Sequence, residues 1–284
     1  MSEARLMHRV WLRNAALAAA AVLLAGLNRP ASAAAAPAVR PAAVHTAQLV
    51  FGGAGFDPLM AHLLVGDTLE IRSTAATKLH LVNAPGEPER VNRTVAAGER
   101  TVLRLGKPGV YLLYDDTTTR FDPEVNQVAA RRDARTFPTP AYAVVLVTDR
   151  NGGGLRTSAD QVHIPDTSMT FRPWVTVVRA GTPVVFTNDD MDPHVVAAAT
   201  APMIMPGPGD VLLRKRMPAF ATLALAADGG SARLTLRQPG LYHYFCPVHA
   251  AYSPAAHTFR PLKSFGGYPF VMDGVIVVLP RTAR

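Results

Sequence analysis

The sequence predicts an all-β fold, two tandem Greek-key β-sandwiches that follow a cleaved signal peptide, and three observations support this prediction. Charged residues make up only 18% of the chain while Pro (24) and Gly (21) are plentiful, a composition that favours short strands and turns. Short apolar runs with alternating polarity recur along the chain. An internal repeat divides most of the chain into two similar parts, which predicts a duplicated architecture.

Residues 1–33 are expected to be a signal peptide of the Sec type. Three arginines give it a positive start, residues 15–27 are apolar apart from Gly26, and Ala31-Ser32-Ala33 is typical of a cleavage site. The alternative is a retained membrane anchor, for which the apolar run is short. We therefore expect a bacterial periplasmic or secreted protein whose mature chain has no membrane span.

The repeat has two constant spacings in the residue numbering. The first segments recur at a spacing of 115 and the last ones at a spacing of 131. The matches are Phe56-Asp57-Pro58 with Phe171-Arg172-Pro173, Pro108-Gly109-Val110-Tyr111 with Pro239-Gly240-Leu241-Tyr242, and residues 144–147 with 275–278. Because the spacing of 131 persists to the end, the long loop before the last strand has the same length in both copies. This pattern predicts a tandem duplication.

The repeat also predicts the domain boundaries. A β-sandwich domain covers residues 44–150, a Gly-rich linker covers 151–158, and a second β-sandwich covers 159–284. Strand-forming runs with turn residues at their centres are expected at 63–71 and 176–187, and strands at 233–236, 241–246 and 274–279, where apolar, aromatic or β-branched residues alternate or cluster. Strands at this spacing, separated by Pro and Gly, indicate a Greek-key sandwich.

The single cysteine of the chain, Cys246, has no partner for an internal disulfide. His249 follows it closely, His194 lies at the end of an apolar stretch upstream, and Met272 precedes the last predicted strand. One thiolate, two imidazoles and a thioether are the ligand set of a type 1 (blue) copper site. We therefore predict one copper per chain, with the first three residues as equatorial ligands and Met272 as the axial ligand.

Each predicted ligand has a plainer interpretation. Cys246 could be an inert buried thiol and Met272 an ordinary core residue. Residues 250–271 separate the second histidine from Met272, and His257 within them could compete as the fourth ligand. This long segment is either a surface insertion or a lid or docking surface for a redox partner.

The motifs NDDMDPHV (188–195), YFCPVH (244–249) and MDGVIV (272–277) resemble the cupredoxins, the family of plastocyanin and amicyanin. The resemblance is strong over the second half of the chain and weaker over the first. It implies that Asn188 stiffens the site through hydrogen bonds near the thiolate and that the His249 edge is the electron exit. The chain departs from the family in the long segment before Met272.

The first half is predicted to lack the copper ligands. At the spacing of 131, Asp115, Thr118 and Ala141 stand where the second half has cysteine, histidine and methionine, and a one-residue gap places His80 on His194. The first half is therefore either a structural domain with a relic histidine or a site for a harder metal that uses His80 and Asp115.

These observations predict an electron carrier rather than an enzyme. Its expected partner is a redox protein, a cytochrome or oxidoreductase with an acidic docking face. The whole chain has a formal net charge of +8, and without the four basic and one acidic residues of 1–33, 25 basic and 20 acidic residues remain, which gives +5. Export argues against nucleic acid. One alternative is a copper enzyme, like nitrite reductases and multicopper oxidases, with a second copper site between subunits. Another is a copper chaperone or storage protein, suggested by Met191, Met203, Met205 and Met217.

Overall fold

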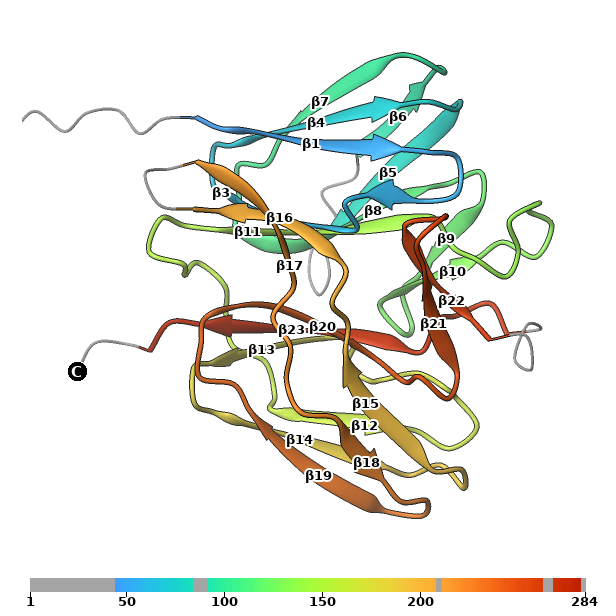
Figure 1. The fold of residues 1–284 in the computed structure, drawn as a ribbon, viewed down its shortest axis with the longest axis vertical. Coiled ribbons are helices and arrows are strands. Elements are labelled where there is room, and N and C mark those ends of the chain that lie inside the picture. The colour runs from blue at the N-terminus through green and yellow to red at the C-terminus, as the bar shows by residue number, and fades with distance from the viewer. Residues whose placement is uncertain (1–43, 84–90, 208–210, 263–267, 282–284) are drawn as a thin grey trace, which may run out of the picture. The chain divides into compact units, whose positions relative to one another are not determined.

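The computed structural model describes residues 44–83, 91–207, 211–262 and 268–281, and the predicted signal peptide lies outside these ranges. All regular elements within these ranges are β-strands, so the predicted all-β class is confirmed (Figure 1). Within the same ranges, no helix is long and apolar enough to cross a membrane.

The first half contains two sheets and a hairpin. One sheet has the order β2-β1-β4-β7, with β1 parallel to β4. Its strands are β1 (Thr46–Phe51), β2 (Phe56–Asp57), β4 (Thr68–Ser73) and β7 (Arg100–Arg104). The other includes the order β3-β11-β8-β5-β6, with β3 parallel to β11. Its strands are β3 (Met60–Leu64), β5 (Thr77–Asn83), β6 (Val91–Val95), β8 (Gly109–Asp115) and β11 (Tyr142–Thr148).

The second half has the same strand order and directions, except that the segment equivalent to β2 forms only an isolated bridge, between His163 and Arg172. One sheet has the order β12-β14-β19, formed by β12 (Gln161–Ile164), β14 (Pro183–Asn188) and β19 (Gly230–Thr235). The other has the order β13-β23-β20-β15-β18, formed by β13 (Val175–Arg179), β15 (His194–Ala198), β18 (Leu223–Leu225), β20 (Gly240–Phe245) and β23 (Asp273–Leu279). The parallel pairs β12–β14 and β13–β23 correspond to β1–β4 and β3–β11. This correspondence agrees with a tandem duplication, which stays a prediction, as do the domain boundaries.

Each half buries an apolar core between its two sheets. In the first half, Leu49 and Ile71 from one sheet pack with Leu81 and Leu113 from the other. In the second half, the core includes three aromatic rings in edge-to-face contact, those of Phe171, Phe186 and Tyr244. Alternate residues of β1 are buried, as expected for a strand with one face toward a core.

A third apolar core joins the two halves. It combines Leu112 and Val144 of the first half with Trp174 and Val275 of the second. Every residue of β8, β11 and β23 is buried, because both faces of these strands are covered. Strands buried on both faces read as continuous apolar runs rather than alternating ones, which explains the sequences of these three strands.

Two equivalent hairpins reach across this junction. They are β9 (Thr119–Asp122) with β10 (Gln127–Ala130), and β21 (Ala250–Ser253) with β22 (Thr258–Pro261). The Gln127 Nε2 donates to the Val271 carbonyl at 2.6 Å, and the Thr258 Oγ1 donates to the Pro140 carbonyl at 3.1 Å. The segment after His249 therefore contains a hairpin packed against the first half, rather than only a free surface insertion.

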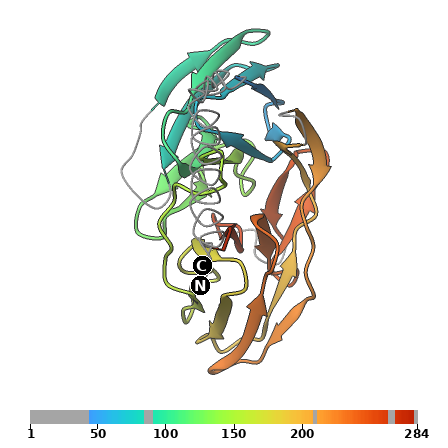
Figure 2. The same cartoon turned by 90° about the vertical axis from the view of Figure 1, so that its left-hand side faces the viewer.

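The methionine-containing segment also crosses to the first half. Strand β16 (Pro202–Pro206) pairs with β3, and β17 (Leu212–Arg216) continues that sheet, so both lie beside first-half strands in two views (Figures 1 and 2). Met203 and Met217 are each only 2% exposed and belong to the shared core. Met191, in contrast, is 68% exposed. These methionines therefore do not share one open surface.

The environment of His62 on β3 provides a test of the packing in the first half. Its Nε2 lies 2.9 Å from the Thr148 hydroxyl, and burial lowers the pKa of His62 from 6.5 to about 4, although Asp67 opposes the shift. The folded protein therefore holds His62 in its neutral form at pH values where the unfolded chain would already protonate it. The stability that depends on the neutral imidazole is present above pH 6.5 and is lost as the pH falls through 4.

Between pH 7 and pH 4.5, the wild type should therefore lose up to about 3 kcal/mol more free energy of unfolding than His62→Gln. Chemical denaturation of both proteins at the two pH values measures this difference. The same acid sensitivity in both proteins would contradict the burial of a neutral imidazole at this position.

Candidate metal centre

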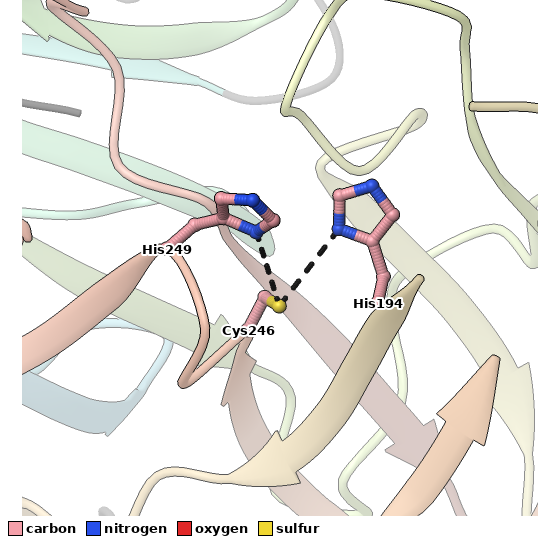
Figure 3. Close-up of side chains that lie close together, drawn as sticks. All are labelled: His194, Cys246 and His249. Carbon is pink, nitrogen blue, oxygen red and sulfur yellow. Dashed lines mark hydrogen bonds between the residues drawn. The ribbon is translucent and has the colours of Figure 1, made fainter. Parts of the chain in front are cut away.

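Three of the predicted ligands meet in one buried cluster. His194 opens β15, Cys246 follows β20, and His249 precedes β21. The Cys246 Sγ lies 3.3 Å from the His249 Nδ1 and 3.9 Å from the His194 Nδ1 (Figure 3). The three ligand atoms lie within 4.8 Å of one another, and the residues are at most 5% exposed. Within the described residues, this is the one group of His, Cys, Asp and Glu side chains close enough to hold a metal ion.

A tight turn brings His249 back over Cys246. The Cys246 carbonyl accepts the N–H groups of His249 (3.0 Å) and Ala250 (2.9 Å), so residues 246–250 reverse the chain at the end of β20. Along β20 the side chains alternate, with Tyr244 and Cys246 in the second-half core and Phe245 against the shared core. This orientation follows from the alternation of side chains along a strand.

Asn188 closes the loop that presents His194. Its Nδ2 donates to the carbonyls of Asp192 (2.8 Å) and Ala226 (2.9 Å), and the residue is fully buried. The sulfur accepts a hydrogen bond from the Val195 N–H, at 3.4 Å. Asn188 thus ties two loops beside the cluster together, while the Val195 N–H of β15 supplies one donor to the Cys246 sulfur.

Asp190 contacts the cluster, although the sequence pattern did not single it out. It is 4% exposed, and its Oδ2 lies 3.1 Å from the His194 Nε2. A carboxylate at this nitrogen favours the tautomer with Nε2 protonated, which leaves Nδ1 as the ligand atom facing Cys246. A carboxylate shortly before a candidate histidine ligand, within one loop, is the signal that could have revealed it.

The surroundings favour uncharged side chains when no metal is bound. Burial raises the pKa of the Cys246 thiol, while backbone N–H groups of Val195, Val248 and His249 act in the opposite direction. Burial also lowers the pKa of His249, and the neighbouring His194 adds to this effect. A bound cation replaces the thiol proton and takes the lone pairs of neutral imidazoles, so metal binding and proton release are coupled at this site.

Met272 and His257 lie in different surroundings. Met272 is 2% exposed and shares the second-half core with Cys246, whose N–H donates to the Met272 carbonyl at 3.0 Å. His257 sits at the tip of the β21–β22 hairpin, where its Nδ1 lies 3.6 Å from Asp57 and its side chain is 42% exposed. His257 is therefore placed away from the cluster, and Met272 as the fourth ligand stays a prediction.

The strand register corrects the predicted equivalence of His80 and His194. His80 pairs with Tyr114, whereas Ala197 pairs with Phe245, so Thr77 occupies the position of His194. The gap placed in the sequence comparison was wrong because the loops before β5 and β15 differ in length.

A hydrogen-bonded cluster stands where the second half has its ligands. Asp115, only 1% exposed, accepts bonds from the hydroxyls of Thr77 (2.8 Å), Thr117 (2.6 Å) and Thr118 (2.8 Å). His80 lies instead 3.8 Å from Asp116. The predicted alternative of a harder metal held by His80 and Asp115 therefore lacks the geometry it needs.

The comparisons with known proteins agree with this donor set. Residues 158–255 match the family described as copper binding proteins, plastocyanin/azurin family, a segment that includes Cys246 and both histidines but ends before Met272. No curated protein matches the chain. A thiolate with two imidazoles suits copper, and the family match identifies copper as the cofactor.

Two solved cupredoxin structures are also similar to the chain. A purple cupredoxin from Nitrosopumilus maritimus is 17% identical, with a TM-score of 0.24, over 42% of this chain and 97% of its own. Amicyanin from Paracoccus versutus (Thiobacillus versutus) is 21% identical, with a TM-score of 0.25, over 44% of this chain and 84% of its own.

Asn188→Ala tests the loop that presents His194. The carbonyls of Asp192 and Ala226 each lose a hydrogen-bond donor, so the free energy of unfolding of the metal-free protein should fall by about 1–3 kcal/mol. Copper should also be lost to a competing chelator at a higher rate. Ser73→Ala, at the equivalent buried position of the first half, is the control, and it should leave copper release unchanged. Equal release rates in Asn188→Ala and the wild type would contradict this role for Asn188.

Proposed function

Because residues 158–255 match the plastocyanin/azurin family of copper-binding proteins, we propose that this protein is a type 1 copper protein that carries single electrons between redox partners. The observation that carries the proposal is the convergence of His194, Cys246 and His249 in one buried cluster. The export signal expected from the sequence supports a periplasmic or secreted location.

These three residues, with Met272 as the proposed fourth ligand, would hold copper, and the bound metal would supply a one-electron exchange between Cu(II) and Cu(I). The chain holds the donors in place before the metal arrives. Cys246 is anchored by its N–H bond to Met272, and Asp190 and the 188–194 loop orient His194. Ligands held this firmly move little when the charge on the metal changes, so an electron can pass at low reorganisation cost.

Surface residues beside the ligands offer a route for the electron. Val248, next to His249 in sequence, is 45% exposed, and Met191, in the loop before His194, is 68% exposed. His249 itself is 5% exposed. We infer that a partner docks over the exposed side chains of Met191 and Val248, which lie in the segments that carry His194 and His249, and that the electron leaves through the His249 ring.

Two alternatives remain to be separated from this function. A copper enzyme of the nitrite reductase or multicopper oxidase kind needs more than one copper, and the neighbours of Cys246 are Phe245 and Pro247 rather than a histidine that could couple two sites. A storage protein would present soft ligands to solvent, whereas Met203 and Met217 are buried in the shared core. Copper content per chain distinguishes the carrier from the enzyme.

Titration with Cu(II) tests the proposed site directly. The wild type should bind one copper per chain and show an intense thiolate-to-copper band in the visible spectrum and a Cu(II) EPR signal. Cys246→Ser should lose the band, because the hydroxyl is a poor substitute for the thiolate ligand. His257→Ala should retain it, since His257 lies outside the cluster. A colourless wild-type protein whose bound Cu(I) is not oxidised by an added oxidant would contradict the electron-carrier proposal.

Val248→Glu tests the docking surface without knowledge of the natural partner. Electron self-exchange between reduced and oxidised copies, followed by NMR line broadening, should slow by about tenfold or more, because a charge is placed where two apolar surfaces meet. The visible spectrum should stay that of the wild type. Val102→Glu is the matched control, since Val102 is 43% exposed on the first half. Equal slowing in both variants would mean that net charge, not this surface, controls the exchange.

A further inference from the structure

A buried carboxylate lies at the junction of the two halves, immediately after Met272. Asp273 is 1% exposed and accepts four hydrogen bonds. Its Oδ1 accepts from Gln127 Nε2 (2.8 Å) and Trp174 Nε1 (3.0 Å), and its Oδ2 accepts from the Tyr142 hydroxyl (2.5 Å) and His243 Nε2 (2.7 Å). Gln127 and Tyr142 belong to the first half, whereas Trp174 and His243 belong to the second.

This arrangement holds the carboxylate in a single position. Two donors on each oxygen fill the four lone-pair sites of a carboxylate, and the donors come from four separate segments of the chain. All four donor side chains are buried, at most 1% exposed, so water cannot replace a donor that is lost. A buried carboxylate deprived of a partner is costly, which makes the position of Asp273 sensitive to each donor.

The hydrogen bonds around Asp273 also hold the residues on both sides of Met272. Gln127 Nε2 bonds both the Val271 carbonyl, at 2.6 Å, and the Asp273 carboxylate, so one first-half side chain holds the residues on either side of Met272. The Met272 carbonyl in turn accepts the Cys246 N–H. Met272 faces the second-half core with Cys246, while the Asp273 side chain faces the junction.

We propose that Gln127 and Tyr142 are positioning residues for the copper site, through which the first half fixes Met272 and thereby sets the reduction potential. This inference rests on the proposed function and extends it. The strength of the axial thioether tunes the potential of such a site, and a small movement of Met272 is enough to change that strength. The first half would then act on the metal although it contributes no ligand.

The test compares Gln127→Met and Tyr142→Phe with the wild type. Both variants keep the shape of the side chain and remove the donor. Each should still bind one copper per chain, but the midpoint potential should rise, because a more loosely held thioether donates less to Cu(II). The visible and EPR spectra should change with it. In a Met272→Leu background, Gln127→Met should no longer shift the potential, because its effect passes through Met272.

Thr258→Val is the matched control. Thr258 occupies the position that the repeat pairs with Gln127, and its hydroxyl donates to the Pro140 carbonyl across the same junction. The acceptor of this bond lies in the first half, whereas the acceptors of Gln127 lie next to Met272. It should lower the thermal unfolding midpoint of the metal-free protein, as Gln127→Met does, and leave the potential and spectra unchanged.

Three outcomes would overturn the inference. The first is a wild-type potential and spectrum in both Gln127→Met and Tyr142→Phe, which would make the network merely structural. The second is an equal shift in Thr258→Val, which would indicate general loosening. The third is a Gln127→Met shift that persists in the Met272→Leu background. The absence of a thiolate-to-copper band in the wild type would instead count against the proposed function, so the two failures are distinguishable.

Discussion

The back-to-back packing of two β-sheets is the constraint on which the rest of the structure depends. Strands β8 and β11 of the first half and β20 and β23 of the second contribute to one shared apolar core, and β8, β11 and β23 are buried along their whole length. Strand β20 leads to Cys246, and β23 begins directly after Met272. The elements that carry two of the four proposed ligands are therefore held by the first half as well as by their own sandwich.

The two halves show how one backbone arrangement accommodates different chemistry. In the second half, the sheet end carries a thiol and two imidazoles whose ligand atoms converge. In the first half, Thr77, Asp115 and Thr118 occupy the corresponding positions and satisfy one another. An internally satisfied oxygen cluster needs no ion, whereas a thiol and two imidazoles that face one another offer soft and borderline donor atoms to a metal. The metal centre thus depends on a few side chains at fixed strand ends.

Several elements of this picture follow from local sequence. The β class follows from short alternating runs, and the orientation of Tyr244 and Cys246 follows from the twofold alternation of a strand. The constant spacing of the later repeat segments predicts two equivalent loops of equal length, and these contain the hairpins β9–β10 and β21–β22. The gap that aligned His80 with His194 failed because the sequence carries no record of strand register where loop lengths differ.

The sequence by itself determined the donor atoms of the metal centre, since residue identity alone decides that a thiolate and two imidazoles are present. Only the tertiary structure decided that Asp190 orients His194, that the hairpin carrying His257 turns toward Asp57, and that Gln127 reaches Asp273. The physical reason is that these contacts join segments whose spacing depends on strand register and sheet packing. Local composition and periodicity report which face a residue occupies, but not which distant residue meets it there.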